Sequence, residues 1–160
     1  MDIEMIYTQF IFFRKEAYMA QVYFEDVKVG DQIPSFAKQA TLMELNRFAG
    51  SNDEFVLIHM DREYSVSVGL PDVIVMGNLK CAYLSRMLMS WIGEEGTLRK
   101  IASSYRGMDI PSDTMVCKGI VTDKYTKDGV NYVVCDIWAE NERVGKTTPG
   151  SAIVTLPSRK

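Results

Sequence analysis

The sequence is poor in cysteine and histidine, which limits the sites that its 160 residues can build. Its three cysteines, Cys81, Cys117 and Cys135, form no CxxC pair and lie far in sequence from the one histidine. This spacing argues against a disulfide framework and against a zinc site. Reduced thiols in the cytosol are the simplest interpretation, so we expect a cytoplasmic protein without a metal or a cofactor.

Excess charge and long apolar runs are also missing. The formal net charge is −3 and no basic block occurs, so the electrostatic footprint of a nucleic-acid-binding protein is absent. The longest apolar candidate, residues 66–92, contains Asp72, Lys80 and Arg86, so we expect no membrane span. Near the N-terminus, acidic residues precede an apolar patch and basic residues follow it, which is the reverse of a signal peptide.

The remaining composition is that of a globular protein. With 47% hydrophobic and 24% charged residues, the chain has enough apolar material to bury a core. Residues 23–31 have the pattern of a domain opening, so we expect one domain over residues 19–160. Residues 1–18 show no clean period. A flexible arm, a swapped strand and an extension from a misplaced start codon are the alternatives, and we expect a poorly ordered extension.

Two short helices are predicted in the first half of the chain. Thr41 followed by Glu44 has the spacing of a capping box, which predicts a helix that ends at Gly50. Asp61 is a good N-cap for a second short helix, which Gly69 ends. The loop between these helices is irregular.

One longer helix follows. The helical pattern runs over residues 78–92 and is closed by Gly93. Its apolar residues cover most of the helix circumference, including Leu79, Tyr83 and Leu88. Such a helix is expected to be buried on nearly all sides.

Strand-like residues dominate the second half. β-Branched and aromatic residues fill residues 98–105, 115–125, 131–140 and 151–156. The pair Asp128-Gly129 is a strong hairpin signal, and Thr148-Pro149-Gly150 predicts a turn before the last strand. An extended run also precedes the helices, at residues 32–39. Strands grouped after helices predict an α+β fold, with a curved antiparallel sheet around the long helix.

The candidate chemistry centres on His59. It lies in a loop with Asp53 and Glu54, and loops on a rigid scaffold are where catalytic groups concentrate. At Gly77 an extended run becomes the long helix, so backbone N–H groups there can face an oxygen that gains negative charge. A carboxylate, a histidine and an oxyanion hole can add or remove water beside a thioester. The plainer alternatives are a structural loop histidine, a solvated acidic loop edge, and Asp61 as a cap only.

Four stretches resemble the MaoC-like dehydratases, which include the (R)-specific enoyl-CoA hydratases. Residues 48–64 have the sequence FAGSNDEFVLIHMDREY, where the family typically has FA-x-x-SGD-x-NPIH-x-D-x-x-YA. Residues 69–79 have the sequence GLPDVIVMGNL, which is similar to the family's GLP-x-x-I-x-HGML. The stretches FEDVKVGD at 24–31 and YRGMDIPSDT at 105–114 resemble the family's opening and the segment before its third strand. The resemblance extends from residue 24 to the C-terminus.

The resemblance implies a hotdog fold, in which a curved antiparallel sheet wraps around the helix at 78–92. It implies a homodimer or a higher oligomer, or a heteromer with a second hotdog chain. The implied substrates are acyl thioesters of coenzyme A or acyl carrier protein, with neither nucleic acid nor a membrane as partner.

The resemblance also assigns roles to residues. His59 falls on the family's catalytic histidine and Glu54 on its catalytic aspartate, with Asp53 as a neighbouring carboxylate. Gly77 is retained at the oxyanion hole, with Asn78 beside it. Three positions depart from the family's pattern: Val56 for asparagine, Leu57 for proline and Met76, in the substrate-binding segment, for histidine.

The expected function is hydration of an enoyl thioester, or its reverse, the dehydration of a 3-hydroxyacyl thioester. An acyl-CoA thioesterase is one alternative, because hotdog proteins also hydrolyse thioesters with a carboxylate and a water. A non-catalytic hotdog subunit that binds acyl-CoA beside an active homologue is another. Dispersed surface charge, rather than a phosphate site, is the expected role of the scattered basic residues Lys80, Arg86, Arg99, Lys100 and Arg106.

Overall fold

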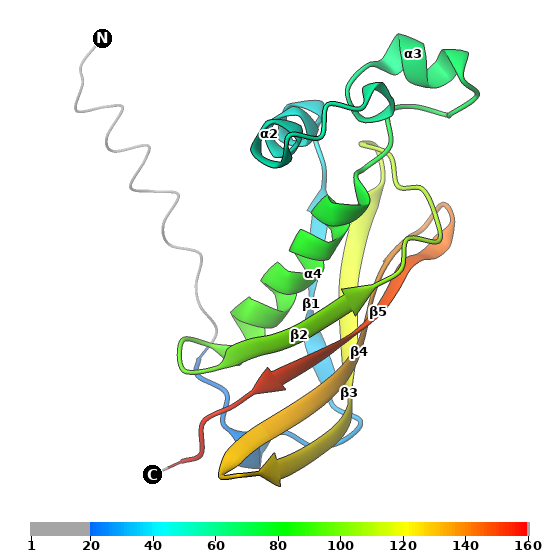
Figure 1. The fold of residues 1–160 in the computed structure, drawn as a ribbon. Helices are drawn as coiled ribbons and strands as arrows, with labels where there is room; N and C mark the ends of the chain where they lie inside the picture. The colour runs from blue at the N-terminus through cyan, green and yellow to red at the C-terminus, as the bar shows by residue number, and fades with distance from the viewer. Residues whose placement is uncertain (1–19, 160) are drawn as a thin grey trace, which may run out of the picture.

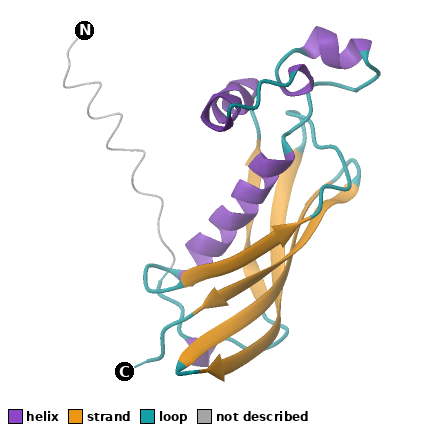
Figure 2. Ribbon diagram, viewed as in Figure 1, coloured by secondary structure: helices purple, strands orange, loops and turns teal. Residues whose placement is uncertain are grey.

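A computed structural model describes residues 20–159 of the chain. A five-stranded antiparallel sheet curves around the long helix α4 (Gly77–Ile92) (Figure 1). The shorter helices α2 (Leu42–Asn52) and α3 (Arg62–Ser67) lie beyond the N-terminal end of α4, away from most of the sheet (Figure 2). The predicted α+β class is therefore confirmed. The extension expected at residues 1–18 lies outside the described residues.

The sheet has the strand order β1-β3-β4-β5-β2. All neighbouring strands are antiparallel. The hairpin predicted at Asp128-Gly129 is confirmed, since both residues have positive φ angles, 50° and 75°, as a type I′ turn requires. The strand bounds are β1 (Gln32–Gln39), β2 (Thr97–Ser103), β3 (Thr114–Lys127), β4 (Val130–Asn141) and β5 (Gly145–Thr155).

The turn predicted at Thr148-Pro149-Gly150 is wrong, because this tripeptide lies inside β5. The chain turns earlier, at residues 142–144. A proline costs a strand only its N–H donor. The Pro149 carbonyl still accepts a hydrogen bond, from the Ser104 N–H at 2.9 Å. Gly150 is needed for close approach of two strands: a Cβ there would collide with the Ala102 carbonyl oxygen of β2.

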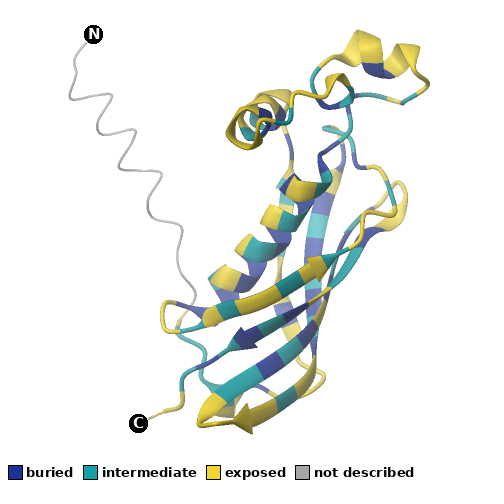
Figure 3. Ribbon diagram, in the orientation of Figure 1, coloured by how far each residue is buried: buried dark blue, intermediate teal, exposed yellow. Residues whose placement is uncertain are grey.

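The helix α4 lies against the concave face of the sheet and fills the core. Its C-terminal end matches the prediction, with Gly93 as the C-cap, and it begins one residue earlier than predicted, at Gly77. The side chains of Leu84, Leu88 and Ile92 are fully buried. The expectation of burial on nearly all sides is wrong, because the sheet wraps only one side of α4 (Figure 3). The face away from the sheet is exposed at Asn78, Ala82, Arg86 and Met89.

Both predicted N-caps are present on the short helices. Thr41 Oγ1 accepts a hydrogen bond from the Glu44 N–H at 3.2 Å, and Asp61 Oδ1 accepts one from the Tyr64 N–H at 2.9 Å. The predicted end of α2 at Gly50 is wrong. Helix α2 continues to Asn52, and Asp53 ends it in the left-handed conformation that aspartate tolerates. Two 3₁₀ turns complete the fold, η1 (Phe24–Asp26) and η2 (Leu57–His59).

No helix within residues 20–159 combines the length and the apolar character needed to cross a membrane.

The cysteines of the sheet are buried and unpaired, which predicts low reactivity. Burial raises the pKa of the Cys117 thiol on β3 and of the Cys135 thiol on β4 to about 12. Only the thiolate attacks a disulfide reagent, so we expect both to react about 1000-fold more slowly than an exposed thiol. Titration with dithionitrobenzoate should find at most one fast thiol, Cys81, in native protein and three in denaturant. Fast labelling of two or more native thiols would contradict this packing.

Candidate active site

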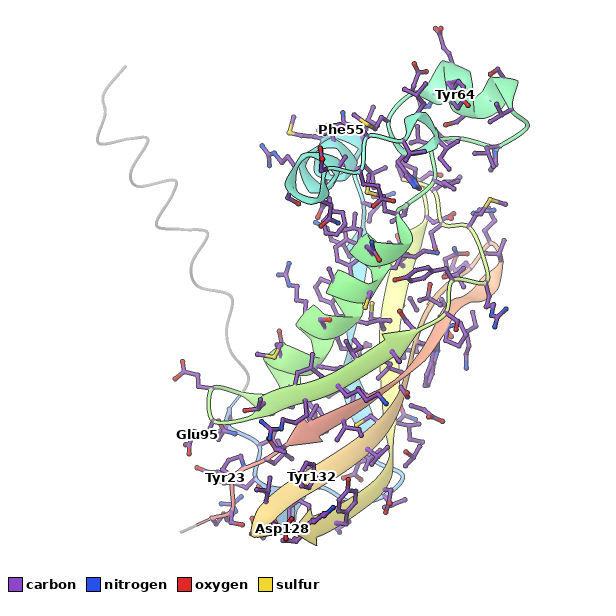
Figure 4. All side chains as sticks on the ribbon, in the orientation of Figure 1. Tyr23, Phe55, Tyr64, Glu95, Asp128 and Tyr132 are labelled. Carbon is purple, nitrogen blue, oxygen red and sulfur yellow. The ribbon has the colours of Figure 1, made fainter. Side chains whose placement is uncertain are left out.

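The candidate site lies where the loop after α2, the turn η2 and the first turn of α4 meet. Figure 4 labels Phe55 on that loop and Tyr64 on α3, both at the end of the molecule beyond the N-terminus of α4. Both side chains are exposed. The site is thus built at one end of the molecule by the segments that connect its helices.

His59 is held in one orientation by a backbone contact. Its side chain is largely buried, and its Nδ1 lies 2.7 Å from the Ile74 carbonyl oxygen. A carbonyl oxygen can only accept, so Nδ1 carries the hydrogen. In the neutral ring Nε2 is then an unprotonated acceptor, directed away from Ile74.

Glu54, rather than Asp53, is the carboxylate that the fold brings to His59. Glu54 Oε1 lies 3.9 Å from His59 Nε2. The Glu54 N–H donates to the Ala49 carbonyl at 3.0 Å, which ties the residue to the end of α2. Asp53 is the exposed C-cap of that helix. A water oxygen about 2.8 Å from both Glu54 Oε1 and His59 Nε2 fits this separation.

The N-terminus of α4 supplies backbone N–H groups that have no acceptor within the helix itself. Gly77 is the first residue of the helix, and the side chain of its N-cap, Met76, makes no capping hydrogen bond. The Met76 side chain is instead fully buried in the core. Asn78 is exposed and accepts a hydrogen bond on Oδ1 from the Tyr105 hydroxyl at 3.2 Å. The first-turn N–H groups, with the positive end of the helix dipole, can therefore face an anionic oxygen.

A cavity of about 280 Å³ joins His59 to this helix terminus. Both His59 and Gly77 line it, as the sequence predicts for two parts of one site. The other seven lining residues were not predicted as part of the site, and four of them, residues 105–108, come from the segment after β2. The complete lining is His59, Ile74, Val75, Gly77, Lys80, Tyr105, Arg106, Gly107 and Met108.

The expectation that Lys80 is a surface charge is wrong. Its side chain is buried, with a residue exposure of 2%, and its ammonium pairs with Asp109 at 2.7 Å. One signal was available in the sequence: Lys80 lies among Leu79, Tyr83 and Leu84, on the face of α4 that fills the core. Its partner, 29 positions further along the chain, had no comparable signal.

A larger hollow of about 790 Å³ lies at the start of β3 and the end of β4. Its walls carry the ion pairs Arg143–Asp113 and Lys118–Glu140. Within each pair, the positive and the negative charge neutralise one another. The Arg143 guanidinium lowers the pKa of Asp113, so that this carboxylate stays ionised. The hollow holds none of the predicted catalytic groups.

The side chains that usually bind metal ions are dispersed in the described part of the chain. Across residues 20–159, no three side chains of histidine, cysteine, aspartate or glutamate gather closely enough to hold a metal ion.

Solved structures with this architecture identify the fold as the hotdog. More particularly, it is the fold of MaoC-like dehydratases and (R)-hydratases, as the sequence motifs suggested. The (R)-hydratase from A. caviae involved in PHA biosynthesis is 19% identical, with a TM-score of 0.75 over 83% of this chain and 99% of that chain. The MaoC-like dehydratase from Rhodospirillum rubrum is 20% identical, with a TM-score of 0.74 over 87% and 99%.

A third similar structure is a chain from a complex of two different proteins. A chain of the ChsH1–ChsH2 complex from Mycobacterium tuberculosis is 19% identical, with a TM-score of 0.71 over 81% of this chain and 98% of that chain. No protein-family model and no curated protein matches the sequence.

Proposed function

We propose that the chain is a hydro-lyase that hydrates enoyl thioesters or dehydrates 3-hydroxyacyl thioesters. The observation that carries this proposal is the placing of Glu54 Oε1 3.9 Å from His59 Nε2, with His59 and Gly77 on one cavity. The fold shared with (R)-hydratases and MaoC-like dehydratases supports it. We take residues 19–160 as the catalytic domain.

The proposed hydration uses one water held by Glu54 and His59. The unprotonated Nε2 of His59 takes a proton from the water as the water oxygen bonds to the β-carbon of the enoyl group. The electron pair of the double bond moves toward the thioester, and the enolate oxygen accepts hydrogen bonds from the N–H groups of Gly77 and Asn78.

The second half of the reaction returns the proton. His59 delivers it to the α-carbon, so the net change is the addition of water across the double bond. Glu54 orients the water and stabilises the positive imidazole ring while it exists. Dehydration is the same sequence in reverse. The deep burial of Met76 restricts it to a backbone role in shaping the turn before Gly77.

The substrate carrier is proposed to be coenzyme A or acyl carrier protein, and the assembly a homodimer. The exposed side chains Phe55, Val56 and Leu57 are apolar, and the exposed face of α4 adds Ala82 and Met89 beside the polar Asn78 and Arg86. A second hotdog chain can cover this surface. The similarity to a chain of the ChsH1–ChsH2 complex makes a heteromer the alternative assembly.

A non-catalytic acyl-CoA-binding subunit is the second candidate function. The observation in its favour is the Tyr105 ring, which lies directly against Gly77 where a thioester oxygen would approach. Absence of turnover together with tight acyl-CoA binding would support this second function.

The adjacent carboxylates provide a matched test of the proposal. Loss of absorbance of crotonyl-CoA and of one longer enoyl-CoA should reveal hydration by the wild type. Glu54→Gln should lower kcat about 100-fold, because the amide cannot stabilise the positive imidazole as a carboxylate does. Asp53→Asn, one residue away and exposed, should leave kcat within about twofold. The reverse pattern would assign the role to Asp53, and no turnover by folded wild type would count against a hydratase.

A further inference from the structure

A buried ion pair lies directly behind the candidate site. The Lys80 ammonium, in the second turn of α4, donates to the Gly107 carbonyl at 2.8 Å and to Asp109 Oδ2 at 2.7 Å. Lys80 is 2% exposed and Asp109 is 0% exposed. Lys80 also lines the cavity that contains His59 and Gly77.

The pair connects the elements that form the site. Lys80 lies three residues after Gly77, so it shares the rigid first turns of α4. The Asp109 carbonyl accepts the Val75 N–H at 2.8 Å, in the segment that leads into that helix. The neighbouring Ile74 carbonyl orients His59. A chain of direct contacts therefore runs from Lys80 through Asp109 and the 74–75 backbone to the His59 ring.

The carboxylate of Asp109 is fixed on both oxygens. Its Oδ1 accepts the Asn141 side-chain amide at 2.6 Å, while Oδ2 accepts Lys80. The Asn141 amide also lies 3.3 Å from Asp113 Oδ2, and Asp113 is held by Arg143. The ion pair thus belongs to a network anchored on β4 and on the turn that follows it.

Stability gives little reason for burying this pair. Removing two charges from water is costly, and apolar residues of similar volume commonly stabilise a core as well or better. The pair instead fixes relative positions, because the Lys80 ammonium holds both the Gly107 carbonyl and the Asp109 carboxylate against the same face of α4.

We propose that Lys80 and Asp109 are positioning residues for the hydratase site. They hold the 105–109 segment and the 74–75 backbone in fixed relation to the first turn of α4. Neither acts on substrate directly. They set the Nδ1–H orientation of His59 and the distance between its Nε2 and the Gly77 N–H. This inference rests on the proposed function for its kinetic consequence, but the orientation of His59 can be measured without turnover.

The test separates an effect on the orientation of His59 from an effect on the stability of the protein, by removing one charge of the pair or both. Lys80→Met leaves the buried Asp109 carboxylate without its counter-charge, so Tm should fall by about 10 °C. The double variant Lys80→Met with Asp109→Asn carries no charge at either position, so no uncompensated ion is left in the core. Its Tm should return to within about 3 °C of the wild type. Lys118→Met removes a partly exposed ion pair with Glu140 and is the control.

Two readouts on the double variant decide the question. In an active wild type, kcat should fall about 30-fold in the double variant with KM within about twofold, although Tm has recovered. His59 is the one histidine in the chain, so its ring ¹⁵N and Nδ1–H resonances need no assignment. We expect one Nδ1–H tautomer in the wild type and in Lys118→Met, and a mixture of tautomers with faster Nδ1–H exchange in the double variant.

The outcomes distinguish this inference from the proposed function. A folded double variant with unchanged His59 resonances, or with unchanged kcat where the wild type is active, overturns the positioning role. The wild type could instead be inactive while the His59 resonances still change in the double variant. That result would contradict the hydratase proposal and support the positioning role.

Discussion

His59→Ala should lower the kcat for enoyl-CoA hydration about 10,000-fold. The proposed mechanism asks the His59 imidazole to take the proton from water and to deliver it to the α-carbon, so two proton transfers fail together. Glu54, 3.9 Å from Nε2 in the wild type, is the remaining base. Its position is set by the end of α2, and we expect it to recover little of the rate. The measurement is the decay of enoyl absorbance at saturating substrate.

A folding control is needed because His59 is largely buried. Removing the ring leaves the Ile74 carbonyl without its Nδ1–H donor, which costs about 1–3 kcal/mol when the oxygen stays buried. Circular dichroism and a Tm should show a folded variant with somewhat reduced stability. A folded His59→Ala protein with more than a tenth of the wild-type kcat would remove His59 from the chemistry. Acyl-CoA affinity close to that of the wild type would place the defect in turnover.

Local interactions explain which parts of the fold could be predicted from the sequence. Thr41 and Asp61 cap their helices through hydrogen bonds to residues three positions away, so a short stretch contains all the necessary information. Asp128-Gly129 can adopt two successive positive φ angles, which determines the hairpin locally. The long helix is equally self-contained, since its apolar pattern and Gly93 define its length.

The errors come from interactions between distant segments. Pro149-Gly150 has the composition of a turn, but its place inside β5 depends on pairing with β4 and on the close approach of Ala102. The exposed face of α4 depends on which side the sheet covers. Lys80 is buried because Asp109, 29 positions away, neutralises it. A single sequence contains no local trace of such a pairing.

The candidate site also has parts that local sequence could predict and parts that depend on distant segments. His59 and Glu54 are five positions apart, and the turn η2 brings them together, so motif spacing was sufficient to predict their proximity. Gly77 reaches the same cavity because the extended segment before it hydrogen-bonds to the Ile58 carbonyl through Ile74. The contribution of Tyr105 to the cavity wall could not be predicted, because this residue reaches the site from beyond the C-terminal end of β2.

Gly77→Ala should lower kcat about 1000-fold and also lower Tm. An added Cβ at Gly77 would overlap the ring of Tyr105, so the methyl group and the ring cannot both keep their places. Both residues line the cavity, so a Tyr105 ring displaced by the methyl would disturb the space in which the thioester oxygen is proposed to meet the helix N–H groups. Losing one oxyanion donor costs about 100- to 1000-fold, and a shift of about 1 Å in the reacting groups costs a similar factor.

The matched control is a glycine that has no such neighbour. Gly50 lies within α2 with nothing within 4 Å of an added Cβ, so Gly50→Ala should keep full activity and raise the unfolding free energy by about 0.5–1 kcal/mol. Tyr105→Ala in the Gly77→Ala background should restore Tm, because it removes the overlapping ring. It should restore kcat only in part, since the cavity then lacks the Tyr105 side chain that lines it. If Gly77→Ala kept kcat within about threefold of the wild type, the N-terminus of α4 would not be the oxyanion site.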